Sequence, residues 1–185
     1  MRQMLAKFGT TELAGGPGAD GTRLRLVDGP LQLAWQHCGQ TSDFIGGFFA
    51  QRCRDGGPDR EEARHSIGYL VNELLENTVK FRAPGDVVVE ASLEGNSFEL
   101  KLSNFVGEDN VVRFQEILKE ITTSDPGDLL IRRIEENAAS ENPSGSGLGL
   151  LTLMSDYGAR LGWAFFRTDS ENPILLETYA ILPLA

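Results

Sequence analysis

The sequence predicts an α+β fold, a two-layer sandwich in which helices cover one face of a mixed, mostly antiparallel sheet. Strand-like segments come in pairs joined by short turns, and segments with helical periodicity separate these pairs. The 185 residues are enough for one domain with its own core. Glycines and a proline crowd residues 15–21, so we expect a loosely attached segment over residues 1–22 and a single domain over residues 23–185.

The first half of the chain predicts two strands and then two helices. Leucines alternate with other residues in 24–26 and again in 31–35, where they indicate strands on either side of a turn. Residues 41–43 (Thr-Ser-Asp) offer capping side chains for a short helix over residues 44–53, which two glycines weaken. The strongest helical pattern follows over residues 58–81.

The second half predicts a hairpin, three helices and a final hairpin. Glu94-Gly95-Asn96 is a hairpin turn, and Ser124-Asp125-Pro126 ends one helix and begins the next. The expected strands are 87–93, 98–104, 163–168 and 174–181, and the expected helices are 111–121, 126–138 and 147–160.

The composition excludes several classes of function. A formal net charge of −10 is unsuited to a nucleic-acid backbone or an anionic membrane surface. Cys38 and Cys53 are too few for a disulfide scaffold or a four-ligand zinc site, so we expect them to act as small hydrophobic residues. The chain has no apolar run of membrane-spanning length and no secretory pattern at its start, which favours the cytoplasm.

Three polar residues form a stripe on the helix expected over 58–81. At about 100° per residue, Glu73, Asn77 and Lys80 fall on one side, next to an apolar face that must be buried. A carboxylate, an amide and an ammonium group there could line the mouth of a cavity. The other interpretation of this stripe is an ordinary solvated flank.

A glycine motif, SGSGLGL, occupies residues 144–150 ahead of a predicted helix. Glycines at alternate positions let backbone N–H groups approach an anion, and the helix N-terminus adds partial positive charge. The spacing is neither the dinucleotide-binding fingerprint nor a P-loop. The other interpretation is a flexible helix cap.

Together these motifs resemble a known superfamily. NELLENTVKF (residues 72–81) resembles the N-box of the GHKL superfamily of ATP-binding proteins, and SGSGLGL resembles its second glycine box. The segments 123–142 and 146–163 are similar to small stand-alone bacterial regulators related to SiaB-type kinases and anti-sigma-factor serine kinases. The resemblance implies a Bergerat-type sandwich that binds ATP and Mg²⁺, and a STAS-like partner protein. It leaves the oligomeric state open, a homodimer included.

The resemblance also implies a role for each motif residue. Glu73 would be the catalytic carboxylate that polarises the attacking hydroxyl, Asn77 would coordinate Mg²⁺, and Lys80 would approach the phosphates. The loop would surround the phosphates, and its nucleotide-binding residues would be Gly145, Ser146, Gly147, Leu148 and Gly149.

One position departs from the family pattern. The first glycine box of the family begins with an aspartate that accepts a hydrogen bond from adenine, and here the corresponding strand carries Asn104. An asparagine can accept through its carbonyl oxygen, but its amide can also turn and donate. The resemblance implies a Mg·ATP-dependent serine/threonine kinase of a STAS-like protein. The alternative is a non-catalytic, partner-binding module whose nucleotide pocket is degenerate or acts as a gate.

Overall fold

The computed structural model describes residues 2–14, 22–26, 35–53, 57–139, 147–167 and 174–184. These residues form an α+β sandwich, which confirms the predicted fold class. Its elements are β1 (Gln3–Gly9), β2 (Thr22–Leu26), α1 (Trp35–Ala50), α2 (Arg60–Phe81), β3 (Val87–Glu94), β4 (Ser97–Val106), α3 (Glu108–Thr123), α4 (Pro126–Ala139), α5 (Leu148–Ser155), β5 (Arg160–Arg167) and β6 (Ile174–Pro183).

One six-stranded sheet has the order β1-β5-β6-β4-β3-β2. In the described part of the chain every strand pairing is antiparallel, where the sequence predicts a mixed sheet. The long connection through α3, α4 and α5 brings the chain back in the direction of β4, but β6 lies between β4 and β5. The two strands of equal direction are therefore not neighbours, and no parallel pair forms.

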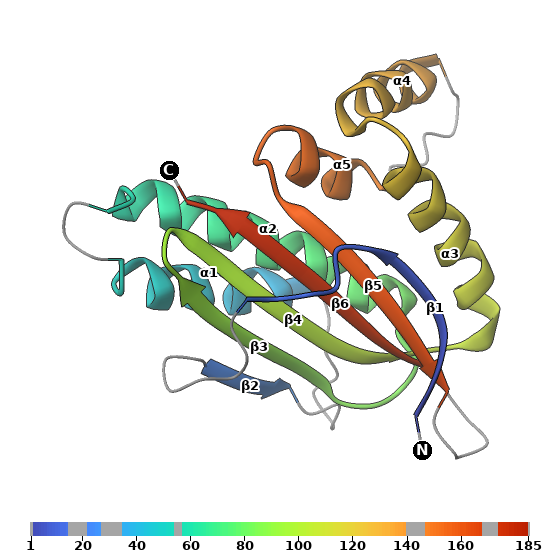
Figure 1. The fold of residues 1–185 in the computed structure, drawn as a ribbon, viewed down its shortest axis with the longest axis horizontal. Coiled ribbons are helices and arrows are strands. Elements are labelled where there is room, and N and C mark those ends of the chain that lie inside the picture. Colours follow the sequence, from blue (N-terminus) through green and yellow to red (C-terminus); the bar gives the residue numbers. More distant parts are fainter. Residues whose placement is uncertain are drawn as a thin grey trace.

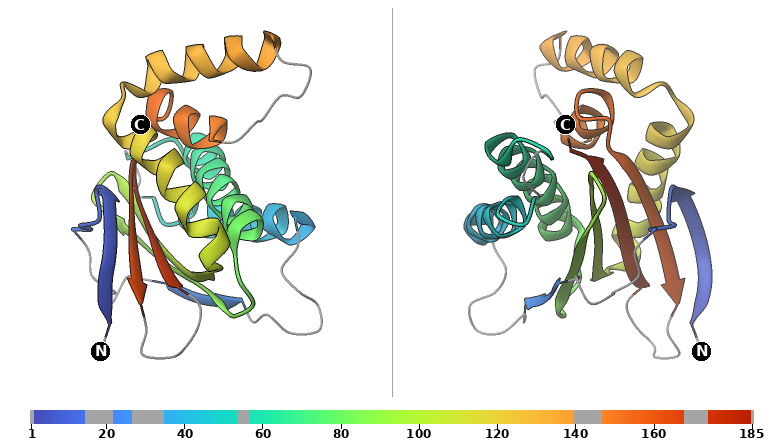
Figure 2. Two further views of the ribbon diagram at one scale, coloured as in Figure 1. Left: turned by 90° about the vertical axis from the view of Figure 1, so that its right-hand side faces the viewer. Right: turned by 60° about the vertical axis from the view of Figure 1, so that its left-hand side comes forward.

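The helices lie together on one face of the sheet (Figures 1 and 2). α1 packs along α2, and α2 faces the sheet with its buried apolar stripe. Every second side chain of the strands packs against this stripe, because side chains along a strand point alternately to opposite faces of the sheet. The largest fully buried side chains of this core include Phe49, Ile67, Leu70, Phe98, Trp163 and Phe165.

The two ends of α2 follow the sequence closely. Asp59 caps the helix by accepting a hydrogen bond from the backbone N–H of Glu62 at 2.9 Å. The helix ends at Phe81, two residues before Ala83-Pro84. Similarly, the Asp125 carboxylate accepts from the backbone N–H of Asp128 at 3.0 Å, where α4 begins.

The start of α1 was predicted wrongly. Residues 41–43 lie inside the helix, which begins at Trp35, and the Ser42 hydroxyl donates to the carbonyl of Gly39 at 2.8 Å instead of capping a helix end. The strand expected over residues 31–35 is not formed by Trp35, and residues 31–34 lie outside the described part. The glycines tolerated in α1 have a packing reason, because a Cβ at Gly46 would stand 2.7 Å from the backbone oxygen of Arg64 in α2.

The described N-terminal residues join the sheet. Gln3–Gly9 form edge strand β1, which pairs with β5, and residues 10–14 then cross the opposite face of the sheet (Figure 1). The backbone N–H of Thr10 donates to Leu161 at 2.9 Å, and that of Ala14 donates to the Glu99 carboxylate at 3.0 Å. The glycine-rich residues 15–21, on which the prediction rested, lie outside the described part.

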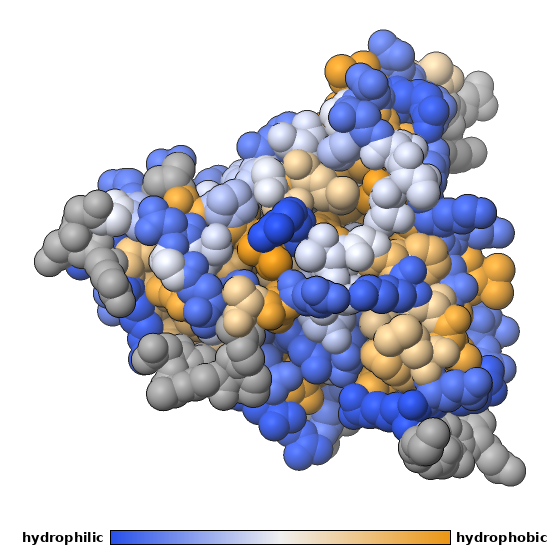
Figure 3. All heavy atoms as spheres, viewed as in Figure 1, coloured by the Kyte–Doolittle hydropathy of each residue, from blue (hydrophilic) through white to orange (hydrophobic). Residues whose placement is uncertain are grey.

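The sheet face away from the helices carries charged side chains among apolar ones (Figure 3). Glu177 is 5% exposed there and pairs with Lys101 at 3.0 Å and with Arg2 at 3.2 Å. The Tyr179 hydroxyl donates to the same carboxylate at 2.5 Å. None of the described helices is long and apolar enough to cross a membrane.

Candidate functional site

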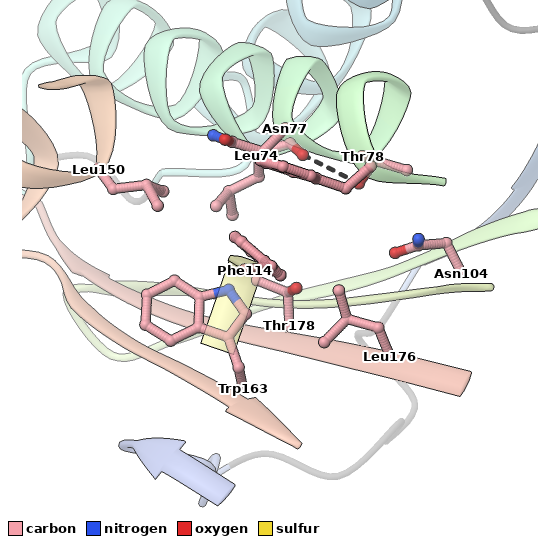
Figure 4. Close-up of a pocket in the computed structure, with 10 residues that line it drawn as sticks. Leu74, Asn77, Thr78, Asn104, Phe114, Leu150, Trp163, Leu176 and Thr178 are labelled. Carbon is pink, nitrogen blue, oxygen red and sulfur yellow. Dashed lines mark hydrogen bonds between the residues drawn. The ribbon is translucent and has the colours of Figure 1, made fainter. Parts of the chain in front are cut away.

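A small cavity lies between the C-terminal half of α2 and the inner face of the sheet (Figure 4). It encloses about 280 Å³ when its open mouth is counted, and its interior has room for about one water molecule. Side chains from α2, α3, α5 and three strands line it: Leu74, Asn77, Thr78, Phe81, Asn104, Phe114, Leu150, Trp163, Leu176 and Thr178. Two of the predicted site residues, Asn77 and Asn104, therefore share one cavity.

Asn104 on β4 presents a buried acceptor to this cavity. Its side chain is 2% exposed, and its Nδ2 donates to the backbone oxygen of Phe105 at 3.0 Å. Its Oδ1 has no hydrogen-bond partner among the described residues, and Figure 4 shows this oxygen facing the cavity. Turning the amide over would place two carbonyl oxygens together, so the bond to Phe105 fixes which atom faces inward. The ambiguity that the sequence leaves at Asn104 is thereby resolved in favour of an acceptor.

Asn77 on α2 is oriented by its own helix. Its Nδ2 donates to the backbone oxygen of Glu73 at 2.8 Å, which leaves Oδ1 as an acceptor. An amide oxygen is a suitable ligand for Mg²⁺, which usually takes only one or two protein ligands besides water and phosphate oxygens. The described residues contain no cluster of three or more His, Cys, Asp or Glu side chains that could hold a metal alone.

Glu73 meets the glycine motif where α5 begins. A Cβ added to Gly149 would overlap the carboxylate of Glu73, so only glycine allows this approach. Burial, and after it the charge of Glu76, raises the pKa of the Glu73 carboxyl above its ordinary value. The structure thus brings Glu73 against the glycine motif, although Glu73 is not among the residues that line the small cavity.

The described part of the glycine motif requires glycine at a second position. Gly147 has φ +90°, a left-handed conformation that side chains rarely adopt, and this backbone conformation, not a lack of space, is the reason for glycine here. Leu148 opens the helix and is half-buried, and Leu150 is buried against the cavity. Gly145 and Ser146 lie outside the described residues.

Lys80 stands apart from this group. It is exposed at the end of α2, with its Nζ 5.4 Å from the centroid of the Phe81 ring, and it does not line the cavity. The sequence places Lys80 on the same stripe as Asn77, which is correct for the helix. The structure does not bring its side chain into the cavity.

Sequence reasoning missed Thr178 and Trp163. Thr178 on β6 is 6% exposed, and Trp163 on β5 is 1% exposed, and both face Asn77 across the cavity (Figure 4). The signal for Thr178 was the polar pair Glu177-Thr178 inside an otherwise apolar strand. Trp163 carries no such signal, because a tryptophan in a strand is expected in any core.

The two cysteines take no part in the site. Both are buried and neither forms a disulfide within the described residues, as predicted for small hydrophobic residues. Burial raises the pKa of the Cys38 thiol to about 11, so it stays protonated near neutral pH and is a poor nucleophile.

No protein-family model, curated protein or solved structure matches this chain.

Proposed function

We propose that this protein is a bacterial, cytoplasmic Mg·ATP-dependent regulator of the GHKL type that phosphorylates a serine or threonine of a small STAS-like partner. The observation that carries the proposal is the unpaired, buried Oδ1 of Asn104 in the same cavity as Asn77. A buried acceptor without a partner costs about 1–3 kcal/mol, so it is well explained as one half of a bond to a ligand.

The residues present fit an adenine nucleotide in their chemistry. Asn104 Oδ1 would accept from the exocyclic amine of the base, apolar side chains such as Trp163 would wall the ring, and Asn77 Oδ1 would hold Mg²⁺. Backbone N–H groups of Gly147 and Gly149 would receive phosphate oxygens. The cavity now has room for about one water molecule, so entry of a nucleotide requires α3 and α5 to move away from α2.

Glu73 is the candidate general base. A half-buried carboxylate with a raised pKa is suited to accept the proton of a hydroxyl group at its Oε atoms. When bound, Mg·ATP would supply the phosphoryl group, with ADP as the leaving group. Phosphoryl transfer needs mostly positioning and charge neutralisation, which a metal on Asn77 and the glycine loop would provide.

A second candidate function belongs to another class. The closed cavity, the asparagine in place of aspartate at position 104 and the position of Glu73 outside the cavity favour a module that binds its partner without phosphorylating it. In that case nucleotide would act as a gate or not bind at all.

Phosphate transfer separates the two functions. The protein is incubated with Mg·ATP and the STAS-like protein encoded beside it, and phosphate on the partner is measured by intact-protein mass spectrometry. We expect the wild type to add one phosphate, and Glu73→Gln to bind ATP with similar affinity but transfer at least 100-fold more slowly. A tight complex without any phosphate on the partner would leave only the binding module.

A further inference from the structure

The position of α5 depends on its neighbours. This helix packs between α2 and α4 (Figure 1). Its inner side carries Leu150, Leu151 and Leu153, which are buried in the core. With eight residues α5 is too short to be stable as an isolated helix, so other elements have to hold it in place. Its contacts with α2 therefore decide how firmly this wall of the small cavity is held.

Two contacts between α2 and α5 lie one helical turn apart on α2. The first is the contact of the Glu73 carboxylate with Gly149 near the start of α5. The second involves Tyr69, which is four residues before Glu73 and therefore on the same side of α2. The Tyr69 ring stacks on the Tyr157 ring, with centroids 5.1 Å apart and an angle of 21° between the ring planes. Aromatic pairs of this kind attract each other beyond the effect of their burial.

Tyr157 is fixed to the end of α5 by a tight turn. The backbone N–H of Ala159 donates to the backbone oxygen of Leu153, in the last turn of α5, at 2.9 Å. Gly158 has φ +63°, the left-handed conformation that is typical of a glycine just after a helix. This turn ties the residues after α5 back to the helix, so the Tyr157 ring and α5 form one unit.

The Tyr69 hydroxyl makes a second link to α5. Burial, and after it the charge of Glu73, raises the pKa of this hydroxyl, and a hydrogen bond with the Thr152 side chain of α5 opposes the rise. Tyr69 therefore contacts the α5 unit through its ring and through its hydroxyl. Both Tyr69 and Tyr157 are only half-buried, so their stack lies at the surface and its loss leaves the apolar core intact.

We propose that the Tyr69–Tyr157 stack is a clamp that holds α5 against α2 and thereby regulates the opening of the small cavity. Leu150 of α5 lines that cavity and the adjacent Gly149 contacts Glu73, so a movement of α5 away from α2 changes both places. The inference deepens the proposed function, on which the part that concerns nucleotide entry rests. It makes Tyr69 a positioning residue that acts on the site through α5.

Hydrogen exchange of the full chain without nucleotide measures the clamp directly. Amides of α5 exchange when this helix opens, and amides of β4 and β6 report global unfolding as an internal reference. We expect Tyr69→Ala and Tyr157→Ala each to speed exchange in α5 at least fivefold relative to the reference strands, because each removes one ring of the stack. The double variant should add little to either single change. Tyr69→Phe keeps the ring and should have a smaller effect than Tyr69→Ala.

Phe44→Ala is the matched control. It breaks another aromatic stack, in which the Phe44 and Phe48 rings of α1 have centroids 5.9 Å apart, and the Phe44 side chain is 56% exposed. Exchange in α5 should be the same in this variant as in the wild type. The clamp is overturned if both tyrosine variants exchange α5 at the wild-type rate. It is also overturned if β4 and β6 are accelerated as much as α5, because the stack would then support the whole fold.

Nucleotide association separates the clamp from the proposed function. The rate is measured by stopped-flow mixing with a fluorescent ATP analogue and Mg²⁺, and we expect Tyr69→Ala to raise the association rate constant at least fivefold and Phe44→Ala to leave it unchanged. Faster exchange in α5 without faster association overturns the regulation of entry. If the tyrosine variants speed exchange in α5 but the wild type binds no nucleotide, the clamp stands and the proposed function fails. If the wild type binds nucleotide and exchange is unchanged, the proposed function stands and the clamp fails.

Discussion

At the scale of single residues, the site depends on two asparagine amides that the backbone holds in fixed orientations. Asn104 gives its N–H to Phe105 and Asn77 gives its N–H to Glu73, so each presents an oxygen. Acceptors fixed before a ligand arrives cost little rearrangement on binding. A ligand for this cavity should therefore bring donors or a cation.

Asn104→Leu separates ligand binding from folding. The substitution removes an unpaired buried oxygen, and the backbone oxygen of Phe105 keeps its bond from Ala83 at 2.8 Å. We expect the free energy of unfolding without ligand to stay equal or rise by about 1 kcal/mol, and affinity for Mg·ATP to fall by about 10- to 100-fold. Urea unfolding and calorimetry check the two halves. A large loss of stability would show that Asn104 serves the fold.

The raised pKa of Glu73 predicts how stability depends on pH. The folded protein holds a proton on Glu73 more tightly than the unfolded chain, whose carboxyl has the ordinary pKa of 4.5. The contribution of this proton to the free energy of unfolding is therefore fully present below pH 4.5 and is lost as the pH rises through the folded-state pKa. Glu73→Gln carries no charge, so its advantage in unfolding free energy over the wild type should be smallest near pH 4 and grow toward pH 7. Urea unfolding at both pH values measures it, and an advantage that shrinks with pH contradicts the assignment.

At the scale of elements, the contact between α2 and α5 is set by one glycine. Gly149→Ala must displace the Glu73 carboxylate, and because this group is the far end of a flexible side chain we expect only the cost of an off-rotamer glutamate, about 0.5–1.5 kcal/mol. In a Glu73→Ala background the obstacle is gone, and alanine should instead stabilise α5 by up to about 1 kcal/mol. A double-mutant cycle followed by thermal unfolding measures this coupling. An equal change in unfolding free energy on Gly149→Ala in both backgrounds would show that Gly149 and Glu73 do not interact.

The packing of α1 on α2 gives a second comparison between glycines. Gly46→Ala places a Cβ against backbone that cannot move away cheaply, and we expect a loss of about 1–3 kcal/mol. Gly47→Ala meets nothing within 4 Å and should gain about 0.5–1 kcal/mol from helix propensity. Chemical unfolding of both variants decides the point, and stabilisation by both would mean that the helices do not touch at Gly46.

The elements show what the sequence could and could not predict. Local signals located α2, both hairpins and the α3–α4 boundary, because capping residues and turns act within a few residues of one another. They failed at the start of α1, where capping residues lie inside the helix, and at β1, whose pairing with β5 joins distant parts of the chain. In the site, the sequence motif predicted Asn77 and Glu73, because both lie on one helix. Thr178 and Trp163 come from strands that only the folded sheet brings there.

At the scale of the whole molecule, the connection between β4 and β5 controls access to the cavity. It contains α3, α4 and α5, and its side chains Phe114 and Leu150 line the cavity opposite α2. Arg132 of α4 pairs with Glu120 of α3 at 2.7 Å, so these two helices are tied together. Entry of the proposed nucleotide would therefore have to move this connection, while α2 and the sheet would keep Asn77 and Asn104 in place.

The negative charge of the chain makes a local cation necessary. With a net charge of −10, the protein has no general attraction for a triphosphate, and Lys80 does not reach the cavity. In the proposed function, Mg²⁺ on Asn77 would supply the positive charge that brings the phosphates beside Glu73, together with the backbone N–H groups of Gly147 and Gly149. Nucleotide binding should therefore require the metal.

Isothermal titration of the full chain with ATP, with and without Mg²⁺, tests the central claim most directly. We predict saturable binding of one nucleotide per chain that depends on Mg²⁺ and weakens at least tenfold in Asn77→Ala, with the thermal unfolding of that variant as the control for folding. Absence of saturable binding up to millimolar Mg·ATP, or equal affinity in Asn77→Ala, would contradict the account.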